Sequence, residues 1–211
     1  MILPKKEHLE PFPDDIEDPV PFYYIPLIRN FYLKRFEMAL DFLGECVPET
    51  ILDLGCGSGI VFPELQKRCK TVIATDLTMD YARLSRLVRL ENLSVGIFQS
   101  NALKVPLCNN SVDRVISISL LEHVPGVFNA VHEIHRILKN DGIAIIGVPV
   151  QRLLLITFFL LARIDYKKYH VTDYTEVMDA ASKLFRKVEI KYFPFYLPKK
   201  QSLYVVLKCY K

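Results

Sequence analysis

A short apolar run that ends in a cluster of glycines is the feature that most constrains the fold of this chain. Residues 51–54 read Ile-Leu-Asp-Leu, and the next five residues contain Gly55, Gly57 and Gly59. Glycine tolerates positive φ angles and lets a ligand approach the backbone closely, and a helix that follows such a turn presents free N–H groups. The segment therefore predicts a strand, a tight turn and a helix that border a ligand crevice.

Similar apolar runs recur along the chain and alternate with segments of helical periodicity. The runs predict strands near 51–54, 71–75, 94–98, 112–118, 142–148, 186–193 and 202–209. Helices are predicted near 59–68, 79–91, 127–139 and 175–184, after a first helix that follows Pro26, and residues 139–142 (Lys-Asn-Asp-Gly) are expected to stop a helix. Strands that are apolar almost throughout and separated by helices are typical of a parallel sheet covered on both faces. The pattern indicates a doubly wound α/β fold.

Composition limits the classes of partner and site. A chain of 211 residues with 51% hydrophobic residues fits one globular domain. The net charge of +3 is too small for an electrostatic footprint on DNA, so no DNA partner is predicted. The five cysteines are scattered and never form a CxxC pair, which favours the reducing cytoplasm. His132 and His135 lack further residues at metal-ligand spacing, so no metal is predicted.

The spacing of the glycines separates two classes of ligand. A dinucleotide-binding turn has the pattern G-x-G-x-x-G, whereas this turn is G-x-G-x-G and has Ile60 where the third glycine would stand. Asp76 ends the second predicted strand about 20 residues after the first glycine, where a carboxylate can accept the ribose hydroxyls of a nucleoside. The pattern therefore favours a nucleoside ligand over a pyrophosphate.

Four segments together resemble the class I S-adenosylmethionine-dependent methyltransferases, in particular their type 11 group. They are residues 53–59 (DLGCGSG), Thr75-Asp76, residues 101–124 (NALKVPLCNNSVDRVISISLLEHV) and residues 133–142 (EIHRILKNDG). The resemblance covers residues 49–149 well, the tail to 211 loosely and the first 45 residues hardly at all. It implies an S-adenosyl-L-methionine cofactor, with S-adenosyl-L-homocysteine as the product.

The resemblance also implies the residues that bind this cofactor. The set is Asp53, Gly55, Cys56, Gly57, Gly59, Asp76, Leu77, Asn101, Ala102 and Ser119. Leu77 would pack on the adenine or belong to the core. Asn101 stands where the family usually has an acid, and its amide oxygen can still accept a bond from the adenine amino group. Glu133, Arg136 and Lys139 match a family helix whose role is structural and solvent-facing.

The full expectation is an α/β doubly wound, mostly parallel seven-stranded sheet, with an antiparallel last strand and helices on both faces. Residues 1–45 are expected to form an arm and a helix that cover the site. The first 26 residues contain six prolines and are predicted to be irregular. Residues 46–211 are expected to form the Rossmann-like domain, with an apolar insertion at about 150–172.

Methyl transfer requires the enzyme to position the reactants, and to supply a base when the acceptor must lose a proton. His123, beside Glu122 after the fourth predicted strand, is the catalytic candidate. The alternative is that the pair only shapes its loop.

The acceptor is predicted from three apolar segments that can reach the crevice. They are residues 22–24, 153–162 and 192–198. They favour a small, hydrophobic or lipid-like acceptor. The run at 153–162 is too short to span a membrane and is compatible with peripheral bilayer contact, burial or a dimer interface. A methyltransferase for RNA or protein and a non-catalytic regulatory module are the alternatives.

Overall fold

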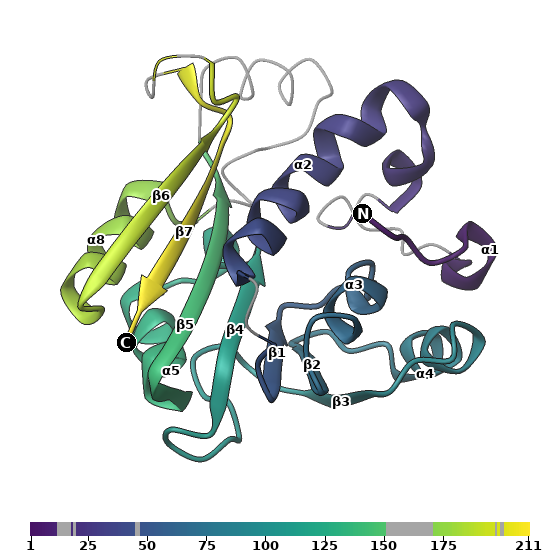
Figure 1. The fold of residues 1–211 in the computed structure, drawn as a ribbon, viewed down its shortest axis with the longest axis horizontal. Coiled ribbons are helices and arrows are strands. Elements are labelled where there is room, and N and C mark those ends of the chain that lie inside the picture. Colours follow the sequence, from purple (N-terminus) through teal and green to yellow (C-terminus); the bar gives the residue numbers. More distant parts are fainter. Residues whose placement is uncertain (12–17, 19, 45–46, 151–170, 197, 199–200) are drawn as a thin grey trace.

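The computed structural model describes residues 1–11, 18, 20–44, 47–150, 171–196, 198 and 201–211. Its strands form a seven-stranded sheet in the order β3-β2-β1-β4-β5-β7-β6 (Figure 1). They are β1 (Thr50–Leu54), β2 (Thr71–Asp76), β3 (Val95–Gln99), β4 (Val112–Ile118), β5 (Leu138–Pro149), β6 (Lys187–Phe193) and β7 (Tyr204–Tyr210). Neighbouring strands are parallel except where β7 pairs with β5 and β6. The predicted fold class is confirmed.

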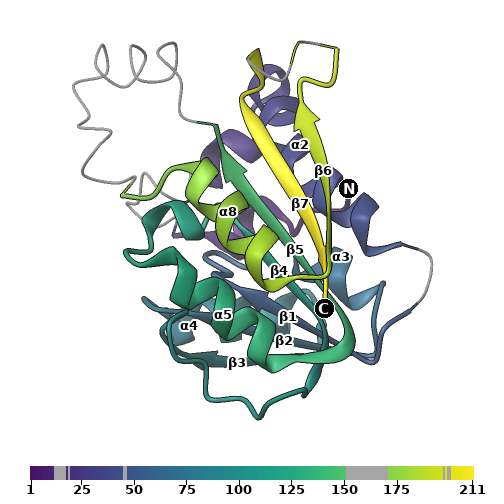
Figure 2. The same ribbon diagram turned by 90° about the vertical axis from the view of Figure 1, so that its left-hand side faces the viewer.

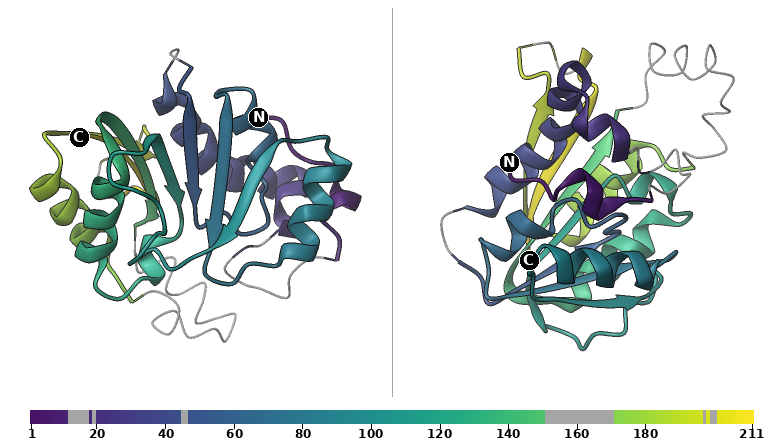
Figure 3. Two further views of the ribbon diagram at one scale, coloured as in Figure 1. Left: turned by 90° about the horizontal axis from the view of Figure 1, so that it is seen from below. Right: turned by 90° about the vertical axis from the view of Figure 1, so that its right-hand side faces the viewer.

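Helices cover both faces of this sheet, as the side views show (Figures 2 and 3). They are α1 (Lys6–Leu9), α2 (Pro26–Leu43), α3 (Phe62–Gln66), α4 (Tyr81–Leu90), α5 (Val127–Ile137) and α8 (Tyr174–Leu184), with the 3-10 turns η1 (Val20–Tyr24) and η2 (Leu121–His123). Helices α2, α3 and α4 share a core with one face, and α5 and α8 share a core with the other. None of the helices in the described ranges is both long and apolar enough to cross a bilayer.

The two cores explain why the central strands are apolar almost throughout. Along β5, Ile143 and Ile145 face the core that contains α2, whereas Ala144 and Ile146 face the core that contains α5. Successive side chains of a strand point to opposite faces, so a strand buried on both faces needs apolar residues at every position.

Helix α5 ends earlier than the sequence predicts. Residues 139–142, expected to stop a helix, belong instead to β5, and Leu138 pairs with Val112 of β4. Lys211 donates its backbone N–H to Gly142 O at 3.1 Å, and Asn110 and Ser111 donate theirs to Arg136 O and Ile137 O at 3.0 and 2.8 Å. These bonds from neighbouring segments satisfy carbonyl groups at the end of the helix and in the residues that follow it.

The first 26 residues are less irregular than predicted, since α1 and η1 lie within them. Helix α1 packs on α4, and η1 packs on α2. Leu9 and Tyr23 are completely buried in these contacts. Tertiary burial therefore holds two short turns in a segment whose prolines argue against regular structure. Further along the chain, Asp173 caps α8 in a capping box with Glu176.

Glu133 has a structural role but does not face solvent, in contrast to the expectation from the resemblance. Glu133 belongs to the buried side of α5, and the residue is 8% exposed. Oε1 accepts the backbone N–H of Val105 at 2.7 Å, and Arg136 donates to both carboxylate oxygens at 2.7 and 2.8 Å. The pair thus fastens α5 to the loop that follows β3.

We expect Glu133→Gln to lower the free energy of unfolding by about 1–3 kcal/mol near neutral pH, because charge-assisted bonds become neutral ones. The hydrogen bonds from Arg136 lower the pKa of Glu133 despite its partial burial. Its stabilising effect is therefore present above the ordinary carboxyl pKa and is lost as the pH falls through the lowered value. Urea unfolding at neutral and acidic pH checks both points.

Glu189→Gln is the matched control, since Glu189 pairs with Lys187 on the surface and should contribute little. A loss for Glu133→Gln as small as the control's would contradict the structural role of the buried pair.

Candidate functional site

The glycine turn is fixed to the neighbouring strand by its backbone. Gly55 and Cys56 both donate their N–H groups to Thr75 O of β2, at 2.8 and 3.1 Å. Gly57 and Gly59 have φ angles of 50° and 75°, which disfavour residues with a Cβ atom. A Cβ on Gly59 would also lie 2.6 Å from the Phe62 ring. The turn after β1 therefore requires glycine for both conformation and space.

Asp76, at the end of β2, is brought directly onto this turn. Its Oδ2 atom accepts the N–H of Gly57 at 3.0 Å, and its Oδ1 atom accepts the N–H of Thr78 at 3.1 Å. The sequence predicted these positions as parts of one site from separate motifs. A carboxylate has capacity for further bonds beyond two, so Asp76 can still accept hydroxyl groups of a ligand.

Asp53 lies beneath the turn in an unusual electrostatic environment. Its side chain is 3% exposed, and among the described residues its Oδ2 atom has no hydrogen-bond partner. Burial raises its pKa to about 8, with further contributions from the negative charges of Asp76 and Asp18. A buried polar atom without a partner is costly, so it marks a place where a ligand or a proton is needed.

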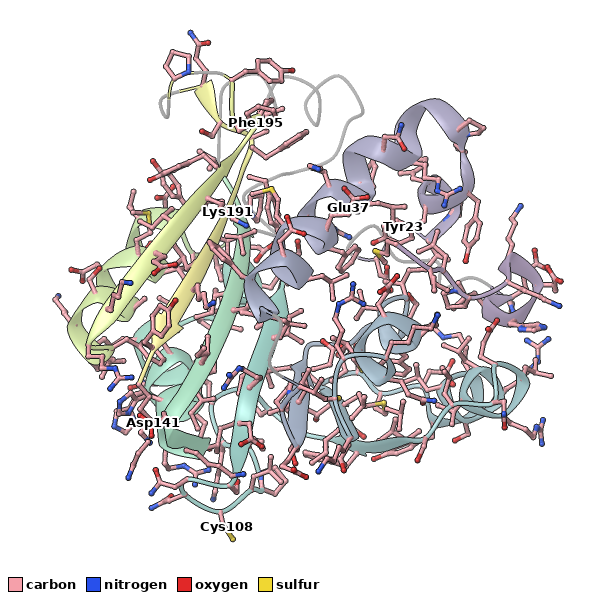
Figure 4. All side chains as sticks on the ribbon, in the orientation of Figure 1. Tyr23, Glu37, Cys108, Asp141, Lys191 and Phe195 are labelled. Carbon is pink, nitrogen blue, oxygen red and sulfur yellow. The ribbon has the colours of Figure 1, made fainter. Side chains whose placement is uncertain are left out.

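The N-terminal segment supplies a third carboxylate to the turn. Asp18 Oδ2 accepts the N–H of Ser58 at 2.7 Å, and Asp18 Oδ1 lies 3.4 Å from the hydroxyl of Tyr23. Figure 4 places Tyr23 between α2 and α3. A Cβ added to Gly57 would lie 2.7 Å from Asp18 Oδ2, so this carboxylate sits directly on the glycine turn.

A buried cation on α2 connects this segment to the end of β4. Arg35 donates to the Tyr23 hydroxyl and, at 3.0 Å, to Ser119 Oγ, which in turn lies 2.8 Å from the hydroxyl of Tyr204. Burial alone would lower the pKa of Arg35, but Tyr23, Tyr204 and nearby carboxylates raise it. Ser119 has a φ angle of 56°, an uncommon value outside glycine. The network therefore holds Ser119 at the crevice in a constrained conformation.

The remaining predicted cofactor residues lie around the same edge of the sheet. Cys56 and Ala102 are buried, and burial raises the pKa of the Cys56 thiol. Leu77, beside Asp76, is 56% exposed, which leaves its side chain open to a flat ligand. Asn101 is exposed, and its Oδ1 atom accepts the N–H of Leu103 at 2.9 Å. The oxygen predicted to bind adenine is therefore already bonded to the backbone two residues further on.

His123 lies at the end of η2, just after β4. Its Nε2 atom is 3.8 Å from Glu122 Oε1, and the Glu122 side chain is almost completely buried. The backbone carbonyl of Glu122 accepts N–H groups from Val171 and Thr172, at 2.9 and 3.1 Å. The pair is therefore held between β4 and the segment that leads into α8.

Sequence analysis missed the roles of Asp18, Arg35 and Tyr204. Asp18 belongs to an acidic, proline-rich stretch that carries no periodic signal. The position of Arg35 could have been noticed, because this residue directly precedes the buried Phe36 in a helix whose apolar residues recur at helical spacing. A cation beside the apolar side of a helix is a candidate for burial. Tyr204 opens the last strand and gives no sign that its hydroxyl reaches β4.

Comparison with known proteins shows which family part of this chain resembles. Residues 52–146 match the family described as methyltransferase domain. An uncharacterized protein of Methanocaldococcus jannaschii is 35% identical over 136 residues, which cover 59% of this chain and 53% of that protein. A probable S-adenosylmethionine-dependent methyltransferase of Mycobacterium tuberculosis is 28% identical over 123 residues, which cover 58% of this chain and 44% of that protein. The chain thus spans about half the length of these curated relatives.

A solved structure resembles the fold over most of the chain. It is geranyl diphosphate C-methyltransferase from Streptomyces coelicolor, in complex with Mg²⁺, geranyl diphosphate and S-adenosyl-L-homocysteine. The TM-score is 0.71 at 16% identity, and the match covers 92% of this chain and 85% of that one. At this identity the likeness concerns the fold alone.

We expect Asp53→Asn to change how stability depends on pH in the absence of ligand. Asp53 has a pKa near its ordinary 3.8 when unfolded and about 8 when folded. Between these values the folded protein retains a proton that the unfolded chain has released, so stability falls as the pH rises through this window and levels off above it. The neutral amide of the variant does not titrate, so its stability lacks this dependence on pH. In denaturant unfolding, the free energy of unfolding of the variant relative to the natural protein should therefore be higher at about pH 8 than at about pH 5.

Asp41→Asn on the exposed side of α2 is the control for loss of one negative charge. Parallel pH profiles for the natural protein and Asp53→Asn would contradict a raised pKa at Asp53.

Proposed function

We propose that this chain transfers a methyl group from S-adenosyl-L-methionine to a small, apolar or lipid-like acceptor, because residues 52–146 match the methyltransferase domain family and a relative is named as a probable S-adenosylmethionine-dependent methyltransferase. The observation that carries the proposal is the glycine turn, with Asp76 bonded to Gly57 and a buried Asp53 oxygen without a partner in the described part of the chain. A turn with only a structural role has no need for an unsatisfied buried carboxyl group.

The residues present fit the cofactor. The glycines at the turn carry no side chain that would block the approach of the methionine end to the backbone, and Asp76 has lone pairs left for the ribose hydroxyls. The exposed Leu77 offers an apolar surface for the adenine, and Asn101 and Ala102 lie on the loop after β3. The bound cofactor supplies a methyl group activated on a sulfonium.

The chain itself then has to position the acceptor and, where needed, remove a proton from it. In-line displacement depends mainly on orientation, which rigid neighbours of the crevice provide. His123 is our proposed base, because a neutral imidazole can take a proton near neutral pH. The carboxylate of Glu122, 3.8 Å from Nε2, would stabilise the charged ring that results.

The character of the acceptor is inferred from the edge of the sheet that carries the turn. Strand β6 runs parallel to β5, because both are antiparallel to β7, so its carboxyl end lies at this edge. There Phe195 and Tyr196 are 82% and 73% exposed, with their ring centroids 5.6 Å apart. Figure 4 shows Phe195 at this end of β6. Exposed aromatic side chains at the ligand-binding edge of a sheet favour an apolar ligand. The predicted apolar run at 153–162 lies outside the described residues.

We also propose that residues 1–45 cover the site, as the sequence suggests. The bonds from Asp18 to Ser58 and from Arg35 to Ser119 support this, because they connect the segment before β1 to two strand ends of the domain.

Asp76→Asn should weaken binding of S-adenosyl-L-homocysteine at least tenfold, because a bond from a hydroxyl to a charged acceptor typically contributes about 1.5–3 kcal/mol. Isothermal titration calorimetry measures the effect. Asp80→Asn is the matched control: Asp80 caps α4 four residues away, and asparagine is an equally good cap. If the natural protein binds neither S-adenosyl-L-methionine nor this product, the proposed function is wrong.

Incubation with methyl-labelled cofactor and a fractionated cell extract should place the label in the organic phase, since we expect an apolar acceptor. Incorporation into RNA or protein would instead identify one of the alternative substrate classes. Cofactor binding without label in any fraction would favour a non-catalytic module. His123→Ala measured in the same assay tests whether the transfer needs a base.

A further inference from the structure

Asp18 lies outside the part of the chain that matches the methyltransferase domain, yet its carboxylate is bonded to the glycine turn. The match covers residues 52–146, and Asp18 is 40 residues before Ser58, whose N–H it accepts at 2.7 Å. Gly57 and Ser58 thus have their adjacent N–H groups bonded to carboxylates from two different segments, Asp76 and Asp18.

These contacts gather negative charge at one place. Asp76 and Asp18 lie on the turn, and both contribute to the raised pKa of the buried Asp53. The guanidinium of Arg35 is connected to Asp18 through the intervening hydroxyl of Tyr23. A ligand with positive charge next to the turn would relieve the repulsion among the carboxylates, whereas a neutral ligand would not.

The position of Asp18 is built into the fold. The Tyr23 hydroxyl faces Asp18 Oδ1, and Tyr23 is completely buried against Tyr32 and Phe36 of α2. The backbone of Asp18 also accepts the N–H of Val20 at 2.7 Å. A carboxylate offers about four lone-pair sites, so Asp18 can keep its bond to Ser58 while it accepts further donors.

We propose that Asp18 is a cofactor-binding residue whose carboxylate pairs with a positively charged group of S-adenosyl-L-methionine. This inference rests on the proposed function and extends the cofactor site into the segment before β1. The Oδ2 atom of Asp53 has no hydrogen-bond partner among the described residues, although the residue is only 3% exposed, and this is an independent sign that the region around the turn receives a ligand. The cofactor has two positive groups, the sulfonium and the ammonium, and either is a suitable counter-ion.

Calorimetry with Asp18→Asn and three ligands tests this pairing. The amide keeps the size of the side chain and an oxygen for Ser58 but removes the charge. S-adenosyl-L-methionine carries both positive groups, S-adenosyl-L-homocysteine carries only the ammonium, and 5′-methylthioadenosine carries neither. We expect about tenfold weaker binding of S-adenosyl-L-methionine and unchanged binding of 5′-methylthioadenosine.

The product distinguishes the two positive groups. Equal weakening for S-adenosyl-L-homocysteine assigns the ammonium as the partner of Asp18, and no weakening assigns the sulfonium. Asp41→Asn, which removes a charge from the exposed side of α2, should leave all three affinities unchanged. Circular dichroism melting verifies that each variant is folded, and Tyr23→Phe, which removes the hydroxyl facing Asp18, should show a smaller loss with the same dependence on ligand charge.

Three results would overturn the proposal. The first is that Asp18→Asn binds S-adenosyl-L-methionine with unchanged affinity. The second is that the variant binds it more tightly, which would mean that Asp18 competes with the cofactor for the N–H groups of the turn. The third is that the variant binds 5′-methylthioadenosine as much more weakly as it binds S-adenosyl-L-methionine. Each is distinct from failure of the proposed function, in which the natural protein binds no cofactor and Asp76→Asn has no effect.

Discussion

Parallel pairing of β1 with β2 is the interaction on which the candidate site depends. Leu54 pairs with Thr75, so the two strands end together, and the Thr75 carbonyl continues the ladder by accepting two N–H groups of the following turn. Asp76, the next residue along β2, is thereby placed within hydrogen-bond distance of Gly57. Strand β4 pairs with the other side of β1 and brings Ser119 to the same edge. The geometry of the crevice is therefore set by backbone bonds before any side chain contributes.

Arg35 extends this backbone frame to the N-terminal segment. A buried cation is costly unless its charge is compensated, and here the guanidinium stacks 4.8 Å from the Phe36 ring and donates to two hydroxyl groups. Those hydroxyls belong to Tyr23 and Ser119, so one side chain connects η1, α2 and β4. Burial alone would lower the pKa of Arg35, but Tyr23, Tyr204 and the carboxylates of Asp18 and Glu122 raise it. The segment before β1 is thereby bonded, through Arg35, to Ser119 directly after β4.

The sequence predicted the parts of the site that depend on local spacing. The glycine turn and Asp76 follow from apolar runs and their ends, and the parallel pairing that joins them is a general property of doubly wound sheets. Residues brought in by tertiary packing were not predictable in this way: Asp18 reaches Ser58 across 40 residues, and Tyr204 reaches Ser119 across 85. The end of α5 was placed too late for a related reason, because Leu138 leaves the helix to pair with Val112 of β4.

The carboxylates at the turn also explain why the protonation of Asp53 should respond to a ligand. Without a counter-ion, the fold limits their repulsion by keeping a proton on Asp53, whose pKa is about 8. A positively charged ligand near Asp76 and Asp18 would stabilise the ionised form of Asp53 and lower that pKa. Linkage then requires that binding below about pH 8 releases a proton and that affinity rises with pH through the same range. Burial of Asp53 lowers the stability of the unliganded protein at higher pH. The same burial couples the charge of the ligand to the protonation of Asp53.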